Sequence, residues 1–93
     1  MKRFAWNVEK NALLKKTRGI SFEDILFHLQ AGDVLDIVAH PNQDRYAGQM
    51  VYVVAVDEYV YLVPFVESDE EVFLKTIIPS RKATKQYRGG SNG

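Results

Sequence analysis

The hydrophobic positions of the chain follow a helical period near its start and an extended period after it. A short alternating segment, 3–6, is predicted to be the first strand. A helix is predicted from 8 to about 17, with Ala12 and Leu13 on a different face from Lys15 and Lys16, and apolar residues recur at helical spacing between Ser21 and Gly32. Gly19 and Gly32 follow the two predicted helices, where a left-handed residue is favoured.

Polar residues stand where both helices should begin. Asn7 precedes the first helix as a plausible N-cap. Ser21 and Asp24 have the spacing of a capping box, in which the Ser21 hydroxyl accepts a backbone N–H and Asp24 reaches back. These caps support two separate helices in the first third of the chain.

The remainder has the period of strands interrupted by turns. Asp57-Glu58 separates two strands at the spacing of a tight hairpin. Pro64 cannot donate a ladder hydrogen bond, so its strand is predicted to lie at an edge there or to carry a bulge. Pro79 is expected to stop the last strand. The predicted strands are 34–39, 49–56, 59–66 and 72–78.

The chain is predicted to close with a short helix capped by Ser80. Residues 89–93 are interpreted as a flexible tail and excluded from a single domain over 1–88. The fold class is α+β: a small antiparallel sheet of about four to five strands, two N-terminal helices and the short C-terminal helix. The exposed face of that last helix carries Arg81, Lys82, Lys85 and Arg88.

Composition narrows the functional classes. Cysteine is absent from the 93 residues, which excludes disulfides and thiolate zinc sites. Neither a glycine-rich phosphate loop nor a metal-ligand spacing occurs, so we expect no cofactor and no metal. No apolar run has the length of a signal peptide or of a membrane span, so we expect a cytoplasmic protein that does not enter a membrane.

Charge is strongly segregated although the formal net charge is zero. Residues 1–18 hold six Lys/Arg and one Glu, residues 19–74 hold one Arg and eleven Asp/Glu, and residues 75–93 hold five Lys/Arg and no acid. We predict that the first and last helices lie side by side and form one positive surface, with Lys10, Lys15 or Lys16 beside Arg81. Such a surface would suit an anionic polymer.

Three segments together resemble the signatures of BrnT-type toxins: FAWNVEK at 4–10, GISFE at 19–23 and IIPSRKAT at 77–84. The resemblance implies a fold like that of RelE-type ribonuclease toxins, cleavage of RNA, and a protein antitoxin that often carries a DNA-binding domain. The chain departs from the family at two places. Arg18 stands where the family commonly has a histidine, and Tyr87 stands near the position of a family glutamate.

RNA cleavage without a metal needs a base, an acid and cations at the pentavalent phosphate. Arg81 and Lys10 fall on the matched motifs and are the predicted phosphate stabilisers, and the alternative for each is a solvated side chain on a helix face. Tyr87 could donate a proton or stack on a base, or it could pack the last helix on the sheet. His40, beside Pro41 at a strand end, is a further catalytic candidate, with surface packing as its alternative.

Other basic side chains are candidates for binding the nucleic acid backbone. Arg45 could reach phosphate from its loop or pair with Asp44. A non-catalytic RNA-binding or protein-interaction module of the same fold is the alternative function. The predicted nucleic-acid-binding residues are Lys15, Lys16, Arg18, Arg45, Lys82 and Lys85.

Overall fold

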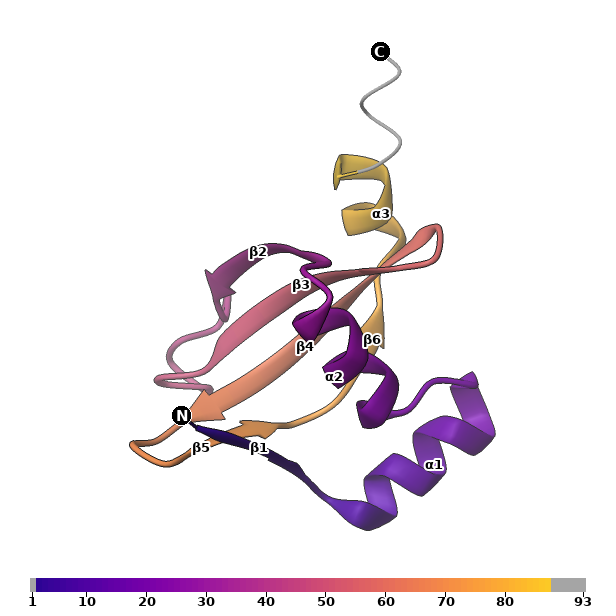
Figure 1. Ribbon diagram of the computed structural model, residues 1–93. Helices are drawn as coiled ribbons and strands as arrows, with labels where there is room; N and C mark the ends of the chain where they lie inside the picture. The colour runs from indigo at the N-terminus through magenta and orange to yellow at the C-terminus, as the bar shows by residue number, and fades with distance from the viewer. Residues whose placement is uncertain (1, 88–93) are drawn as a thin grey trace.

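A six-stranded sheet forms the centre of the molecule in the computed structural model, which describes residues 2–87 (Figure 1). The strand order is β1-β5-β4-β3-β2, and β6 also pairs with β4. In chain order the elements are β1 (Arg3–Trp6), α1 (Val8–Arg18), α2 (Phe22–Gln30), β2 (Val34–Ala39), β3 (Met50–Val56), β4 (Tyr59–Glu67), β5 (Glu71–Leu74), β6 (Ile78–Pro79) and α3 (Arg81–Tyr87).

The α+β class and the arrangement of two N-terminal helices and a short C-terminal one are confirmed, whereas the sheet is larger than predicted and not wholly antiparallel. Strand β1 pairs in parallel with β5, so that Phe4 lies opposite Val72 and Trp6 opposite Leu74. A parallel pair needs a long connection, and here nearly the whole chain runs between the two strands. Short connections alone therefore could not reveal this pairing.

The last predicted strand, 72–78, is divided into β5 and β6. Strand β5 pairs with β4 from Phe65 to Glu67, and β6 pairs with it at Tyr61 and Leu62. Pro64 lies at the gap between them, where β4 has no paired strand on that side, so the predicted local edge fits the structure. On its other side Pro64 pairs with Val51 of β3 without a register shift, and its carbonyl accepts a hydrogen bond from the Lys75 N–H at 2.8 Å.

The helices cover opposite faces of the sheet. The main core cluster joins Leu14 of α1 and Ile25 of α2 to Val54, whereas a smaller cluster joins Ala83 of α3 to Val53. Successive strand residues point to opposite faces. Because Val53 and Val54 are neighbours in β3, α3 must pack on the face away from α1 and α2.

The motif residues near the start of the chain mostly build the helix pair. Trp6 stacks on the fully buried Phe22, with ring centroids 5.7 Å apart. The Asn7 side chain accepts the Lys10 N–H at 2.8 Å and caps α1. Gly19 ends α1 with φ 69°, and Ser21 forms the predicted capping box with α2. The helix caps predicted from the sequence are confirmed.

Asn11 joins the two helices through both ends of its side chain, which is 8% exposed. Its Oδ1 accepts the Phe22 N–H at 2.7 Å, and its Nδ2 donates to Glu23 Oε1 at 2.8 Å. The hydrogen bond from Asn11 is the main cause that lowers the pKa of Glu23. This bridge fixes the start of α1 relative to α2.

Asp36 lies in the exposed edge strand β2. This strand carries exposed apolar side chains, including Ile37 at 51%, and its register shifts between Val34 and Asp36. The Asp36 carboxylate accepts the Ile37 N–H at 2.8 Å and the Tyr87 hydroxyl at 3.1 Å. A bulge and a charge are common protections against edge-to-edge pairing.

Within residues 2–87, no helix has both the length and the apolar character needed to cross a membrane.

Candidate functional site

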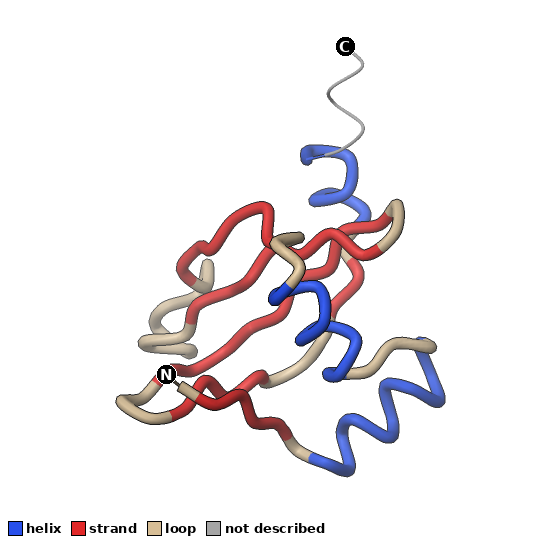
Figure 2. The backbone as a smooth tube through the Cα atoms, viewed as in Figure 1, coloured by secondary structure: helices blue, strands red, loops and turns tan. Residues whose placement is uncertain are grey.

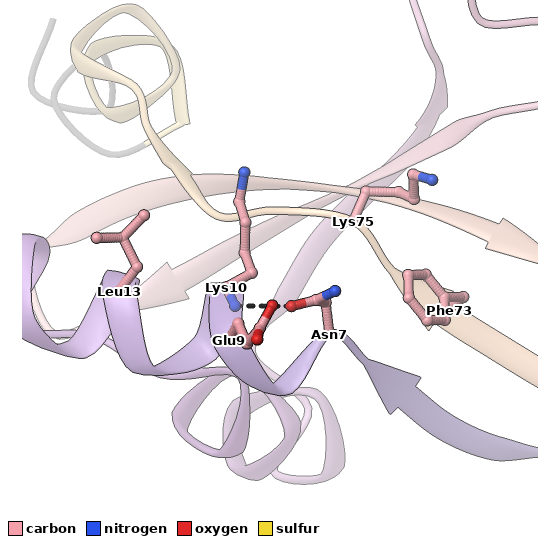
Figure 3. Close-up of a pocket in the computed structure, with 6 residues that line it drawn as sticks. All are labelled: Asn7, Glu9, Lys10, Leu13, Phe73 and Lys75. Carbon is pink, nitrogen blue, oxygen red and sulfur yellow. Dashed lines mark hydrogen bonds between the residues drawn. The ribbon is translucent and has the colours of Figure 1, made fainter.

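Two adjoining cavities open between the start of α1, the loop after β2 and the segment that joins β5 to β6. The larger measures about 530 Å³ (Figure 3) and the smaller about 280 Å³. Lys10 and Lys75 line both, so we call the combined surface the lysine cleft. Its other lining residues are Asn7, Glu9, Leu13, His40, Tyr46, Gln49, Pro64, Phe73, Thr76 and Ile78.

The geometry of α1 directs Lys10 into the cleft. Residues on a helix are separated by about 100°, so Lys10 lies near the buried Leu14 when viewed along the axis. Figure 3 shows its side chain rising from α1 toward the loop segment after β5 that carries Lys75. Lys16 lies on the far side of the helix from Leu14 by the same geometry. Both lysines are exposed, but Lys10 lies on the side of α1 that carries Leu14, whereas Lys16 lies on the opposite side.

Lys75 reaches the cleft from the end of β5. Its Nζ lies 5.5 Å from the centre of the Phe73 ring, a cation–π distance. Among residues 2–87, neither Lys75 nor Lys10 forms an ion pair with a carboxylate. The larger cavity is also lined by Glu9. Two uncompensated ammonium groups and one carboxylate thus share a concave surface.

The loop between β2 and β3 forms the opposite wall, and Gln43 holds it in shape. The Gln43 amide donates to the His40 carbonyl at 2.8 Å and to the Gln49 carbonyl at 3.1 Å, and it accepts the Gly48 N–H at 3.2 Å. Asn42 accepts the Arg45 N–H at 3.2 Å. The loop is therefore organised by its own side chains.

His40 and Tyr46 form an aromatic pair on this wall, with ring centroids 4.3 Å apart and planes inclined by 35°. The Asn42 N–H donates to His40 Nδ1 at 3.1 Å. Because Nδ1 acts as an acceptor, the proton of the neutral ring belongs on Nε2. In this arrangement His40 is a hydrogen-bond donor toward an anion and not a base.

The predicted shared surface of the first and last helices is wrong. Figures 1 and 2 show α1 and α3 at opposite ends of the molecule. They pack on opposite faces of the sheet, α1 through Leu14 and α3 through Ala83. Arg81 and Lys10, which both fall on the segments of the resemblance, therefore lie on helices that do not pack side by side.

Helix α3 offers little to an anion at its start. It has seven residues, and the Ser80 hydroxyl accepts the Ala83 N–H at 3.0 Å. Thr84 accepts the Val60 N–H at 2.8 Å and donates to the Ser80 carbonyl. These motif residues dock the helix on β4. The predicted candidates Arg81, Lys82 and Lys85 are exposed on it, and Arg88 lies outside the described residues together with the predicted tail.

Tyr87 packs the last helix against the sheet, which was one of its two predicted roles. It contacts the cluster of Val53, Val60 and Ala83, and its hydroxyl donates to Asp36. That hydrogen bond is the main cause that raises the pKa of Tyr87. A raised pKa makes the hydroxyl a weaker proton donor near neutrality.

The remaining predicted phosphate ligands are scattered. Lys15 lies on the side of α1 toward Glu23, whose pKa it helps to lower. The Arg18 guanidinium donates to the Ile77 carbonyl at 2.5 Å, which ties the end of α1 to the chain before β6. Arg45 lies over the Tyr46 ring, 5.7 Å from its centre, and not within ion-pair distance of Asp44.

The sequence interpretation missed Lys75, Glu9 and Tyr46. One signal was available: Phe73 alternates with the core residues Val72 and Leu74 in β5, and Lys75 follows directly after that strand. Nothing local in the sequence indicates that this segment lies beside Lys10. Within residues 2–87, no cluster of three or more His, Asp or Glu side chains is arranged to hold a metal ion.

Comparisons of the chain with protein-family models, with curated proteins and with solved structures gave no match. The resemblance to BrnT-type toxins therefore depends on the three motifs of the sequence alone.

Proposed function

We propose that this protein is a toxin-type endoribonuclease that binds single-stranded RNA in the lysine cleft and cleaves it without a metal. The observation that carries the proposal is the convergence of Lys10, Lys75 and His40 on one concave surface, although they come from three separate parts of the chain. All three can donate hydrogen bonds to phosphate oxygens. The motif resemblance supports the same class of substrate.

The proposed reaction is attack by a ribose 2′-oxygen on the adjacent phosphorus. The 2′-hydroxyl loses its proton to the Glu9 carboxylate, a new P–O bond forms, and the bond to the 5′-oxygen breaks. A lysine ammonium protonates that leaving oxygen, which gives a 2′,3′-cyclic phosphate and a 5′-hydroxyl end. The other lysine and the Nε2–H of His40 stabilise the charge of the pentavalent phosphate.

The alternative is an RNA-binding protein without catalytic activity. The hydrogen bond that His40 Nδ1 accepts from Asn42 favours it, because this bond removes the most obvious base from the cleft. RNA binding would still depend on Lys10 and Lys75. The two functions thus share a binding surface and differ only in whether the RNA is cut.

A protein antitoxin is the partner that the resemblance implies, and we propose that it acts with this chain in the cytoplasm. Leu13, which is 55% exposed at the rim of the cleft, and Phe27, which is 66% exposed, are available for such contacts. Co-purification of the two proteins from one operon would test this partnership.

Incubation of the purified protein with labelled single-stranded RNA in excess EDTA tests the proposed reaction. We expect fragments that end in a cyclic phosphate, and a rate that falls about a hundredfold or more in Lys75→Gln, the typical effect of removing an electrostatic stabiliser. Lys16→Gln is the matched control, because it removes the same charge from the outward face of α1.

Three outcomes are informative. Intact RNA that is nevertheless bound would establish the non-catalytic alternative. Equal loss of activity in Lys16→Gln and Lys75→Gln would show that only the overall positive charge of the protein matters. That result would contradict a role for the lysine cleft. Full activity in Lys75→Gln with loss in Arg81→Ala would move the site to α3.

A further inference from the structure

Tyr46 is an aromatic side chain that lies outside the core. It is 36% exposed and belongs to neither core cluster. Its ring lies against His40 on one wall of the smaller cavity, which Lys10 and Lys75 also line. An exposed aromatic ring beside unpaired cations is the combination that single-stranded nucleic acids require, because bases stack on such rings while phosphates bind the cations.

The loop holds this ring in place before any ligand arrives. The Tyr46 N–H donates to the Asn42 carbonyl at 2.9 Å, and the Gln49 N–H donates to the Tyr46 carbonyl at 3.0 Å. With the Gln43 contacts, these bonds fix the backbone on both sides of the ring. Binding to a preorganised ring loses less conformational entropy than binding to a mobile one.

We propose that Tyr46 forms a nucleobase-stacking subsite, which accepts one unpaired base of the RNA whose neighbouring phosphates bind Lys10 and Lys75. The inference rests on the proposed function and specifies its substrate. His40 supports the ring through the contact between their ring faces. Arg45, only loosely associated with the ring at 5.7 Å, moves aside and binds the base or the next phosphate.

The size of the cavity and the stacking requirement select for single strands. A volume of about 280 Å³ lies just below the range of about 300–1,000 Å³ for small-molecule sites, so the cavity can take no more than one nucleotide. In a duplex the bases are paired and stacked on each other, so their faces cannot reach Tyr46. Lys10 and Lys75 alone would bind duplex and single-stranded RNA alike. Tyr46 gives the preference for the single strand.

Fluorescence anisotropy of the full chain with a labelled single-stranded RNA of about six nucleotides tests the subsite. We expect Tyr46→Ala to weaken binding about tenfold and Tyr46→Phe to bind like the unchanged protein, because the ring is retained. The same RNA annealed to its complement should bind the unchanged protein and Tyr46→Ala equally. Circular dichroism of both variants checks that they are folded.

The possible failures of the two proposals differ. If Tyr46→Ala binds the single strand as tightly as the unchanged protein, the subsite is wrong and the lysine cleft is unaffected. If Tyr46→Ala and Tyr46→Phe weaken binding equally, the hydroxyl matters and stacking is wrong. If the unchanged protein binds no RNA, the proposed function fails and the subsite with it.

Discussion

Replacement of Asn11 by alanine should destabilise the protein more than a typical helix substitution. Asn11 is buried between α1 and α2, and its side chain accepts the Phe22 N–H and donates to Glu23. Alanine leaves the Phe22 N–H, which belongs to a fully buried residue, without its partner. A buried donor without a partner costs about 1–3 kcal/mol.

We therefore expect the free energy of unfolding to fall by about 2 kcal/mol, which lowers the melting temperature by about 8 °C or more for a domain of this size. Thermal and urea unfolding followed by circular dichroism measure both quantities. An unchanged melting temperature in Asn11→Ala would refute the inference that this side chain holds the helix pair together.

Asn11→Asp is the variant to compare with Asn11→Ala. Its stability at different pH values separates the retained hydrogen bond from the added charge repulsion. It retains an acceptor for Phe22 but places a second carboxylate against Glu23. In the unchanged protein the lowered pKa of Glu23 stabilises the fold above the unfolded value of about 4.3, and this stabilisation is lost as the pH falls through the folded pKa. Asn11→Asp should therefore be least stable relative to the unchanged protein at neutral pH, and the difference should shrink in acid.

Three further predictions concern the sheet edge and the last helix. Asp36→Ala removes the acceptor at the Ile37 N–H and should increase concentration-dependent association in light scattering; identical scattering would contradict the protective role of this residue. The raised pKa of Tyr87 stabilises the fold below the unfolded value of about 10, and this contribution is lost as the pH rises through the folded pKa. Tyr87→Phe should therefore abolish one late-titrating phenol in an alkaline absorbance titration. Thr84→Val should cost about 1–3 kcal/mol in urea unfolding because the Val60 N–H loses its acceptor, whereas Thr84→Ser should cost much less.

The local features of the fold could be predicted because they depend on neighbouring residues. The caps at Asn7 and Ser21 and the left-handed Gly19 are confirmed, as is the turn at Asp57, which adopts φ 57°. Each is determined within a few residues by hydrogen bonding or by steric limits on the backbone. The α+β class followed from the same local periods.

Pairing between distant segments could not be predicted in this way. The parallel contact of β1 with β5 and the division of 72–78 around Pro64 depend on how the whole sheet is assembled. The charge segregation along the chain was misleading for the same reason. Two basic segments at the ends of a sequence need not meet, and here the sheet separates α1 from α3.

The candidate site shows the same difference between local features, which could be predicted, and contacts between distant segments, which could not. Lys10 and His40 were candidates by residue type and position, and the structure places both in one cleft. Lys75 and Tyr46 complete the cleft, but they carry no signal of function until the topology brings their segments together. Arg81, the strongest candidate by motif, lies elsewhere because α3 packs on β4.

The most direct test of the account is a nuclear magnetic resonance titration of the labelled chain with a short single-stranded RNA. We predict that the amide signals of Lys10, His40, Tyr46 and Lys75 shift together and saturate at one RNA concentration, while those of α3 stay in place. Shifts confined to α3, or no shifts at low salt, would contradict the central claim that the lysine cleft binds RNA.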